Sequence, residues 1–138
     1  MMVNRGSRGF YVALWIMLCA YLGACDATTS PTPIGAQLRI INVGSRELEG
    51  LVVLFPNQRV EFGDLAVGLV TSYRAASNGV FRYAAYEFRV AGRVQHQPVV
   101  DWVGEEPMEG RAFTYSLELV DTPSLGRTIR LVSTGRDY

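Results

Sequence analysis

The sequence contains no lysine. All thirteen basic residues are arginine, and they match thirteen aspartates and glutamates, so the formal net charge is zero. A protein without surplus positive charge is not expected to bind nucleic acid. The chain has only 138 residues, which fit one small domain and a targeting segment rather than a two-domain enzyme.

Histidine is also scarce, because His96 is the only one. A site with several histidine ligands is therefore excluded, and any Ser-His-Asp or Cys-His arrangement would have to use this one residue. His96 lies between two glutamines in an expected strand, so we interpret it as a partly exposed strand residue. No phosphate-binding glycine loop, G-x-S-x-G or H-E-x-x-H motif occurs. We expect no enzymatic activity, no catalytic residue, no cofactor and no metal ligand set.

No apolar run is long. The longest covers residues 10–22, about thirteen residues, and follows an N-terminus that carries Arg5 and Arg8 but no acid. A membrane-spanning helix needs about 20 apolar residues, so this pattern is more typical of the hydrophobic region of a signal peptide.

The apolar run ends at Leu22-Gly23-Ala24-Cys25, which resembles the bacterial lipobox. The resemblance implies that lipoprotein signal peptidase recognises Leu22, Gly23 and Ala24, and that Cys25 is the lipidated first residue of the mature protein. Cys19 is a weaker candidate, because the bulky Leu18 precedes it. The alternative to a cleaved signal peptide is an uncleaved anchor helix with a chance motif at its end.

The domain organisation follows from this interpretation: a signal peptide over residues 1–24, a flexible tether over 25–36 and a folded domain over 37–138. The tether is rich in Thr, Ser, Pro and Gly, which bury too little apolar surface to fold alone. Cleavage would remove Cys19 and occupy Cys25 with lipid, so the mature domain would have no free thiol and no disulfide.

The domain is predicted to be all-β, a small immunoglobulin-like or transthyretin-like β-sandwich of about seven to eight strands. Short apolar or alternating runs are separated by turn residues such as Pro56-Asn57 and Ser77-Asn78-Gly79. Neighbouring strands are expected to form hairpins. The predicted strands are residues 38–43, 51–55, 59–62, 69–74, 80–91, 93–100, 111–120 and 128–133.

The clearest strand is 111–120, where apolar and polar residues alternate, and 128–133 repeats the pattern after a turn. These two runs predict a C-terminal hairpin. The run 80–91 is apolar on both faces, which indicates a central strand or a strand with a bulge. A helix through residues 77–90 is the alternative.

Candidate ligand contacts are the acids of the expected loop at 101–110 and two aromatic residues. Clustered carboxylates favour Ca²⁺, although the spacing is not that of an EF-hand and we prefer to interpret the segment as a solvated loop. Exposed aromatic rings stack on sugars or anchor partner proteins, although most aromatics here are expected in the core. The candidates are Tyr73, Asp101, Trp102, Glu105, Glu106 and Glu109.

Most of the expected domain resembles small, largely uncharacterised bacterial lipoproteins with the patterns "yGd…aG.tS.Y" and "qPiDyvGE". Trp102 stands where such proteins often have Tyr. The resemblance implies a compact β-sandwich exported to the cell envelope, and it brings no catalytic residue or ligand. The matching segments are residues 62–68, 71–74, 81–84, 97–105 and 113–115.

We therefore expect a protein of the bacterial cell envelope, anchored to a membrane through lipid on Cys25 and facing away from the cytoplasm. Its expected role is that of a non-enzymatic binding or structural module, with an envelope protein or a glycan as partner. The alternative is a glycan-binding or Ca²⁺-stabilised accessory module.

Overall fold

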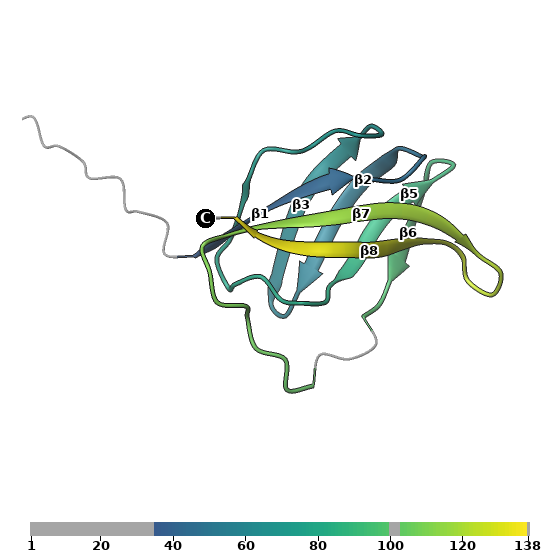
Figure 1. Ribbon diagram of the computed structural model, residues 1–138. Helices are drawn as coiled ribbons and strands as arrows, with labels where there is room; N and C mark the ends of the chain where they lie inside the picture. The colour runs from purple at the N-terminus through teal and green to yellow at the C-terminus, as the bar shows by residue number, and fades with distance from the viewer. Residues whose placement is uncertain (1–34, 100–102, 138) are drawn as a thin grey trace, which may run out of the picture. The chain divides into compact units, whose positions relative to one another are not determined.

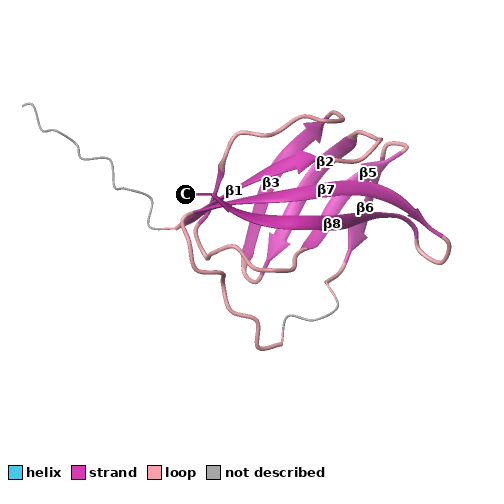
Figure 2. Cartoon of the chain, in the orientation of Figure 1, coloured by secondary structure: helices cyan, strands magenta, loops and turns pink. Residues whose placement is uncertain are grey.

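The computed structural model describes residues 35–99 and 103–137 (Figure 1). This part of the chain forms strands and loops only (Figure 2), and it holds no helix long and apolar enough to cross a membrane. The strands are β1 (Ala36–Asn42), β2 (Leu48–Phe55), β3 (Gln58–Leu65), β4 (Arg74–Ala76), β5 (Ala85–Val90), β6 (Arg93–Gln97), β7 (Ala112–Thr122) and β8 (Gly126–Asp137).

The strands form two four-stranded sheets, with the orders β4-β1-β7-β8 and β3-β2-β5-β6. The fold is therefore the all-β sandwich that the turn spacing and alternation predicted. Hairpins join β2 to β3, β5 to β6 and β7 to β8, as expected for neighbouring strands. The other connections cross between the sheets, and β1 pairs with β7 in parallel.

The alternation of apolar and polar residues explains how each strand buries one face. Along β1, every second side chain from Ala36 to Asn42 is buried and the others are partly exposed. In β7 the ring of Phe113 is fully covered, and Tyr115 is edge-on to Phe55 at 6.2 Å between ring centroids. The buried apolar side chains of the described residues form one hydrophobic core, to which both sheets contribute.

Asn42 is a buried polar residue at the end of β1. Its side-chain nitrogen Nδ2 donates to the backbone carbonyl of Arg46 at 2.8 Å and to the backbone carbonyl of Leu65, in the other sheet, at 3.0 Å. Its side-chain oxygen accepts from the Gly44 amide at 3.0 Å. These bonds satisfy the buried amide and join the two sheets at this end of the sandwich.

Three predicted strands, 69–74, 80–91 and 93–100, are shorter in the structure. The run 69–74 makes one bridge to β1, at Val70, and otherwise forms strand only at β4. In 80–91 the strand begins at Ala85, and the helix alternative is wrong. Val80 and Phe81 are buried from a loop instead, which explains why the run is apolar on both faces.

The loop before β5 is held by a glycine and a turn. Gly79 has φ of +90°, and a Cβ there would lie 2.5 Å from the Cβ of Pro107. Only glycine satisfies both the left-handed backbone and this close approach. The predicted strand 93–100 also ends early, at Gln97, because Pro98 has no backbone N–H to continue the ladder.

Candidate functional site

A cavity of about 410 Å³ opens between the two sheets at the side formed by the edge strands β6 and β8. Its described walls come from the end of β6 and the residues after it, from β8, and from β5 with the loop before it (Figure 1). None of these wall residues carries a charge at neutral pH. They are Tyr83, Ala84, Tyr86, Gln97, Pro98, Val99, Ile129 and Leu131.

Gln97 fixes one wall of this cavity. Its side-chain nitrogen donates to the Ile129 carbonyl at 2.8 Å, and its side-chain oxygen accepts from the Ile129 amide at 2.6 Å. The amide side chain thus pairs with the edge of β8 as the peptide group of another strand would. The two bonds hold β6 against β8 and leave the Gln97 side chain little freedom to turn.

Tyr86 is a wall residue of the cavity, and its hydroxyl has an unusual environment. The residue lies on β5 and is only 3% exposed. Its hydroxyl is buried without a hydrogen-bond partner, and it is the one such side-chain atom among the described residues. Burial raises the pKa of the Tyr86 hydroxyl far above its ordinary value, so the group stays protonated and neutral.

Tyr115, on the facing sheet, is a useful contrast to Tyr86. Its side chain is also fully buried, but its hydroxyl donates to the carbonyl of Phe81. Burial, and to a smaller degree the nearby Tyr86, raises the pKa of the Tyr115 hydroxyl. Of two buried phenols in one core, one is satisfied by the protein and the other is not.

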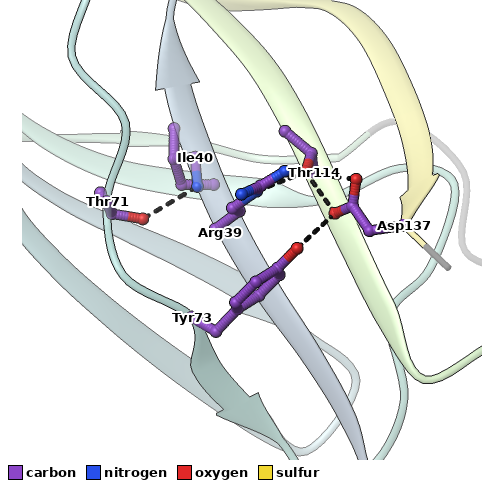
Figure 3. Close-up of polar contacts among 6 residues, drawn as sticks. All are labelled: Arg39, Ile40, Thr71, Tyr73, Thr114 and Asp137. Atoms are coloured by element: carbon purple, nitrogen blue, oxygen red, sulfur yellow. Dashed lines mark hydrogen bonds and ion pairs between the residues drawn. The ribbon is translucent and has the colours of Figure 1, made fainter.

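Tyr73, a candidate ligand contact from the sequence, lies elsewhere, in a polar cluster that Figure 3 shows. Its hydroxyl donates to Asp137 at 2.8 Å, and the Arg39 guanidinium lies 4.8 Å from its ring centroid. Thr114 links Arg39 to Asp137, because Arg39 donates to the Thr114 hydroxyl at 2.8 Å and this hydroxyl donates to Asp137. Tyr73 thus already has partners for both its hydroxyl and its ring face.

The cluster ties the end of β8 to β1 and to the loop before β4 (Figure 3). Hydrogen bonds from Thr114 and Tyr73, then the charge of Arg39, lower the pKa of Asp137. In the same loop, the Thr71 hydroxyl accepts from the Ile40 amide at 3.0 Å. Because the polar groups of the cluster are hydrogen-bonded to one another, we interpret the cluster as one that stabilises the fold.

The acidic candidates are spread out. Glu105 and Glu106 line a surface depression together with Arg82, and the Glu109 backbone carbonyl accepts a hydrogen bond from Arg136. In residues 35–99 and 103–137, no group of three or more His, Cys, Asp or Glu residues could hold a metal ion. The structure brings none of these acids to Tyr73.

The other predicted site residues lie outside the described residues, namely Leu22, Gly23, Ala24, Cys25, Asp101 and Trp102. His96 is an exposed residue of β6, with its Nδ1 3.3 Å from a carboxylate oxygen of Glu87.

Sequence reasoning placed Tyr86 among the core aromatics and gave Gln97 no role. No local pattern could have identified Gln97, because its partner Ile129 on β8 lies 32 residues further along the chain. The unpartnered hydroxyl of Tyr86 likewise depends on the packing of the whole core. Comparisons with protein-family models, with curated proteins and with solved structures find no match for this chain.

Proposed function

We propose that this protein is a lipid-anchored, non-enzymatic binding module of the bacterial cell envelope, and that it binds a small molecule in the cavity between β6 and β8. The observation that carries the binding function is the cavity, whose described wall residues are uncharged and mainly apolar. A volume of about 410 Å³ lies within the range of small-molecule sites.

The chemistry of the walls favours binding over catalysis. A general acid or base works best with a pKa near the working pH. The titratable groups among the described wall residues are the phenols of Tyr83 and Tyr86, and burial raises the pKa of Tyr86 further from neutrality. The described walls offer mainly apolar surface, which is typical of a binding site for a small molecule.

The anchor is proposed from the lipobox resemblance at Cys25. The expected mature chain keeps all thirteen arginines except Arg5 and Arg8, against thirteen acids, so its formal charge is about −2. Attraction to acidic lipid would therefore not hold it at a membrane. Two or three acyl chains would, because each buried methylene contributes about 0.8 kcal/mol. The tether over residues 25–36 would then reach at most about 40 Å.

The test is native mass spectrometry of C-terminally tagged protein, extracted from its own membranes with mild detergent. We expect residues 25–138 plus a diacylglyceryl group and an amide-linked acyl chain, with a further small molecule that is lost on unfolding. Cys25→Ser should leave an unprocessed chain of 138 residues. An unmodified wild-type chain would contradict the anchor.

A pair of variants tests the cavity. Leu131→Asp places a charge on a cavity wall, while Val132→Asp changes the next residue, which is 53% exposed and is not among the described wall residues. We expect the first to lose the bound molecule and the second to keep it, with both still lipidated. A wild-type spectrum without any bound small molecule, or equal loss in both variants, would contradict binding in this cavity.

A further inference from the structure

The exposed apolar residues of the sandwich are unevenly distributed. Among the described residues, nine large apolar residues are exposed, and four of these lie in two segments that touch at the end of β1. The Gly68 amide donates to the Asn42 carbonyl at 2.9 Å, and the Asn42 amide donates to the Leu69 carbonyl at 3.0 Å. Single apolar residues on a surface are ordinary, whereas a group of them marks a contact with another molecule. We name these four residues the apolar patch: Val43, Val67, Leu69 and Val70.

No charge interrupts the apolar patch. The two segments that contain it, residues 40–45 and 65–73, have no charged residue. Arg46, the first charged residue after the segment 40–45, lies 2.7 Å from a carboxylate oxygen of Asp121. The patch therefore offers apolar contact rather than attraction between charges.

The loop between β3 and β4 presents part of the patch on a well-bonded turn. The Leu69 amide donates to the Ala66 carbonyl at 3.2 Å, and Gly68 has φ of +75°, as the third residue of a type II turn requires. Val67 therefore lies at the tip of the turn. Backbone groups that enter an apolar medium must already be hydrogen-bonded. This turn meets that need at Gly68 and Leu69, whose amides both have carbonyl partners.

The proposed lipid anchor indicates what covers the patch. Residues 25–34 separate the sandwich from the lipid on Cys25, and when extended they span at most about 35 Å. From Ala36 to Asn42, β1 covers about 20 Å, at about 3.3 Å per residue. An anchored chain can therefore lay the patch on the bilayer that holds Cys25. Among candidate occupants, this bilayer is the one that the anchor keeps within reach at all times.

We propose that the apolar patch is a second membrane contact, which inserts its side chains at the surface of the bilayer that anchors Cys25. The inference rests on the proposed anchor and adds an orientation, in which the end of β1 faces the lipid. Because the patch is uncharged, zwitterionic lipid suffices and acidic lipid adds no affinity. Four partly exposed side chains give a weak contact, so the contact depends on the anchor.

The test supplies the anchor chemically. The chain of residues 25–138 contains both sheets and the hydrophobic core, and Cys25 is its only cysteine. Coupling this thiol to a maleimide phospholipid in phosphatidylcholine nanodiscs fixes the chain to a bilayer at Cys25. Doxyl-labelled phosphatidylcholine then weakens the amide signals of the ¹⁵N-labelled protein according to their distance from the lipid.

We expect the signals of Val67, Leu69 and Val70 to lose more intensity than those of Ala36 and Ala76. The last two residues pair with each other at the start of β1, where the tether begins, so they would be nearest to the bilayer if the tether alone held the domain. The difference should be the same when the nanodisc contains acidic phosphatidylglycerol.

Two variants remove the proposed contact. Leu69→Asp and Val67→Asp each place a charge in the patch, and each should abolish the difference between the two groups of signals. Leu125→Asp is the matched control, because Leu125 is 74% exposed in the turn between β7 and β8, which lies away from the loop between β3 and β4 (Figure 1). It should keep the difference.

The outcomes separate the anchor from the patch. Greatest loss of signal at Ala36 and Ala76, or equal loss along the chain, would refute the membrane contact while leaving the anchor intact. If the chain is a dimer without lipid and Leu69→Asp makes it a monomer, a second copy covers the patch, and the proposal is wrong. Native protein without lipid on Cys25 in the mass spectrum would refute the anchor and, with it, this contact.

Discussion

Replacing Tyr86 with Phe should stabilise the protein, which is unusual for a change in a core. The side chain is only 3% exposed, and its hydroxyl has no partner. Burying an unsatisfied polar group costs about 1–3 kcal/mol, and Phe keeps the ring while removing that group. We expect the free energy of unfolding to rise by about 1 kcal/mol, at the low end of this range.

The same substitution at Tyr115 should have the opposite sign. Tyr115→Phe removes the donor to the Phe81 carbonyl and leaves that buried acceptor unpaired, so stability should fall by about 1–3 kcal/mol. Urea unfolding followed by far-ultraviolet circular dichroism measures both variants. The slope with denaturant should stay constant, because neither change alters the area exposed on unfolding. In thermal unfolding, 1 kcal/mol corresponds to a shift in Tm of roughly 4–8 °C for a domain of this size.

One result would refute the reasoning. If Tyr86→Phe lowers stability as much as Tyr115→Phe does, the Tyr86 hydroxyl has a strong partner in the free protein.

Three further predictions concern the fold. Gln97→Ala should lower the free energy of unfolding by about 1–3 kcal/mol and speed hydrogen exchange at the Ile129 amide. Unchanged exchange at this amide would contradict the two hydrogen bonds between Gln97 and Ile129. The pKa of Asp137 lies below its ordinary value of 3.8, so the ionised carboxylate stabilises the fold above pH 3.8, and this stabilisation is lost as the pH falls through the folded-state pKa. Asp137→Asn should therefore flatten the decline of Tm between about pH 5 and pH 2. An unchanged decline would argue against the polar cluster around Asp137. Gly79→Ala combines φ of +90° with a clash between the new Cβ and Pro107, so it should lower the free energy of unfolding in urea by well over 1 kcal/mol. Gly63→Ala has φ of +78° and nothing within 4 Å of its new Cβ, so it should cost only about 1 kcal/mol. Equal losses would show that the clash with Pro107 is relieved without cost.

The fold was predictable where local alternation dominates. The run 111–120 alternates because β7 buries one face from Phe113 to Leu119, and its hairpin with 128–133 follows from the turn between them. The structure extends the second strand of this hairpin to Asp137, since β8 continues to pair with β7 although most of its last residues are exposed. Pairing can lengthen a strand beyond its apolar pattern.

The loop before β5 could not be predicted in this way. Val80 and Phe81 are as apolar as strand residues, yet they enter the core from irregular backbone. The backbone carbonyls of this loop are satisfied by distant groups, namely Tyr115 for Phe81 and the Met108 amide for Val80. A local pattern records burial but not the source of hydrogen bonds, so it cannot distinguish such a loop from a strand.

The cavity was even less accessible from the sequence, because it depends on the meeting of β6 and β8 from different sheets. The sequence analysis selected Tyr73 and the acids of 101–110 as candidate contacts because aromatic and acidic residues can bind ligands. The structure instead places Tyr73 in a network with Arg39 and Asp137. The unpartnered hydroxyl of Tyr86 is visible only once every buried polar atom has been assigned its partner.

The proposed anchor and the proposed binding site act through different strands. The chain enters the sandwich at β1, an inner strand with β4 on one side and six register pairs with β7 on the other. None of the described wall residues of the cavity lies on β1, and the hydrogen bonds from Gln97 join β6 to β8 without involving β1. A pull from a membrane-bound Cys25 would therefore load the β1–β7 ladder along its length, while the cavity is held by bonds that this ladder does not share. A ligand in the proposed site would therefore contact none of the β1 residues that follow the proposed anchor and tether.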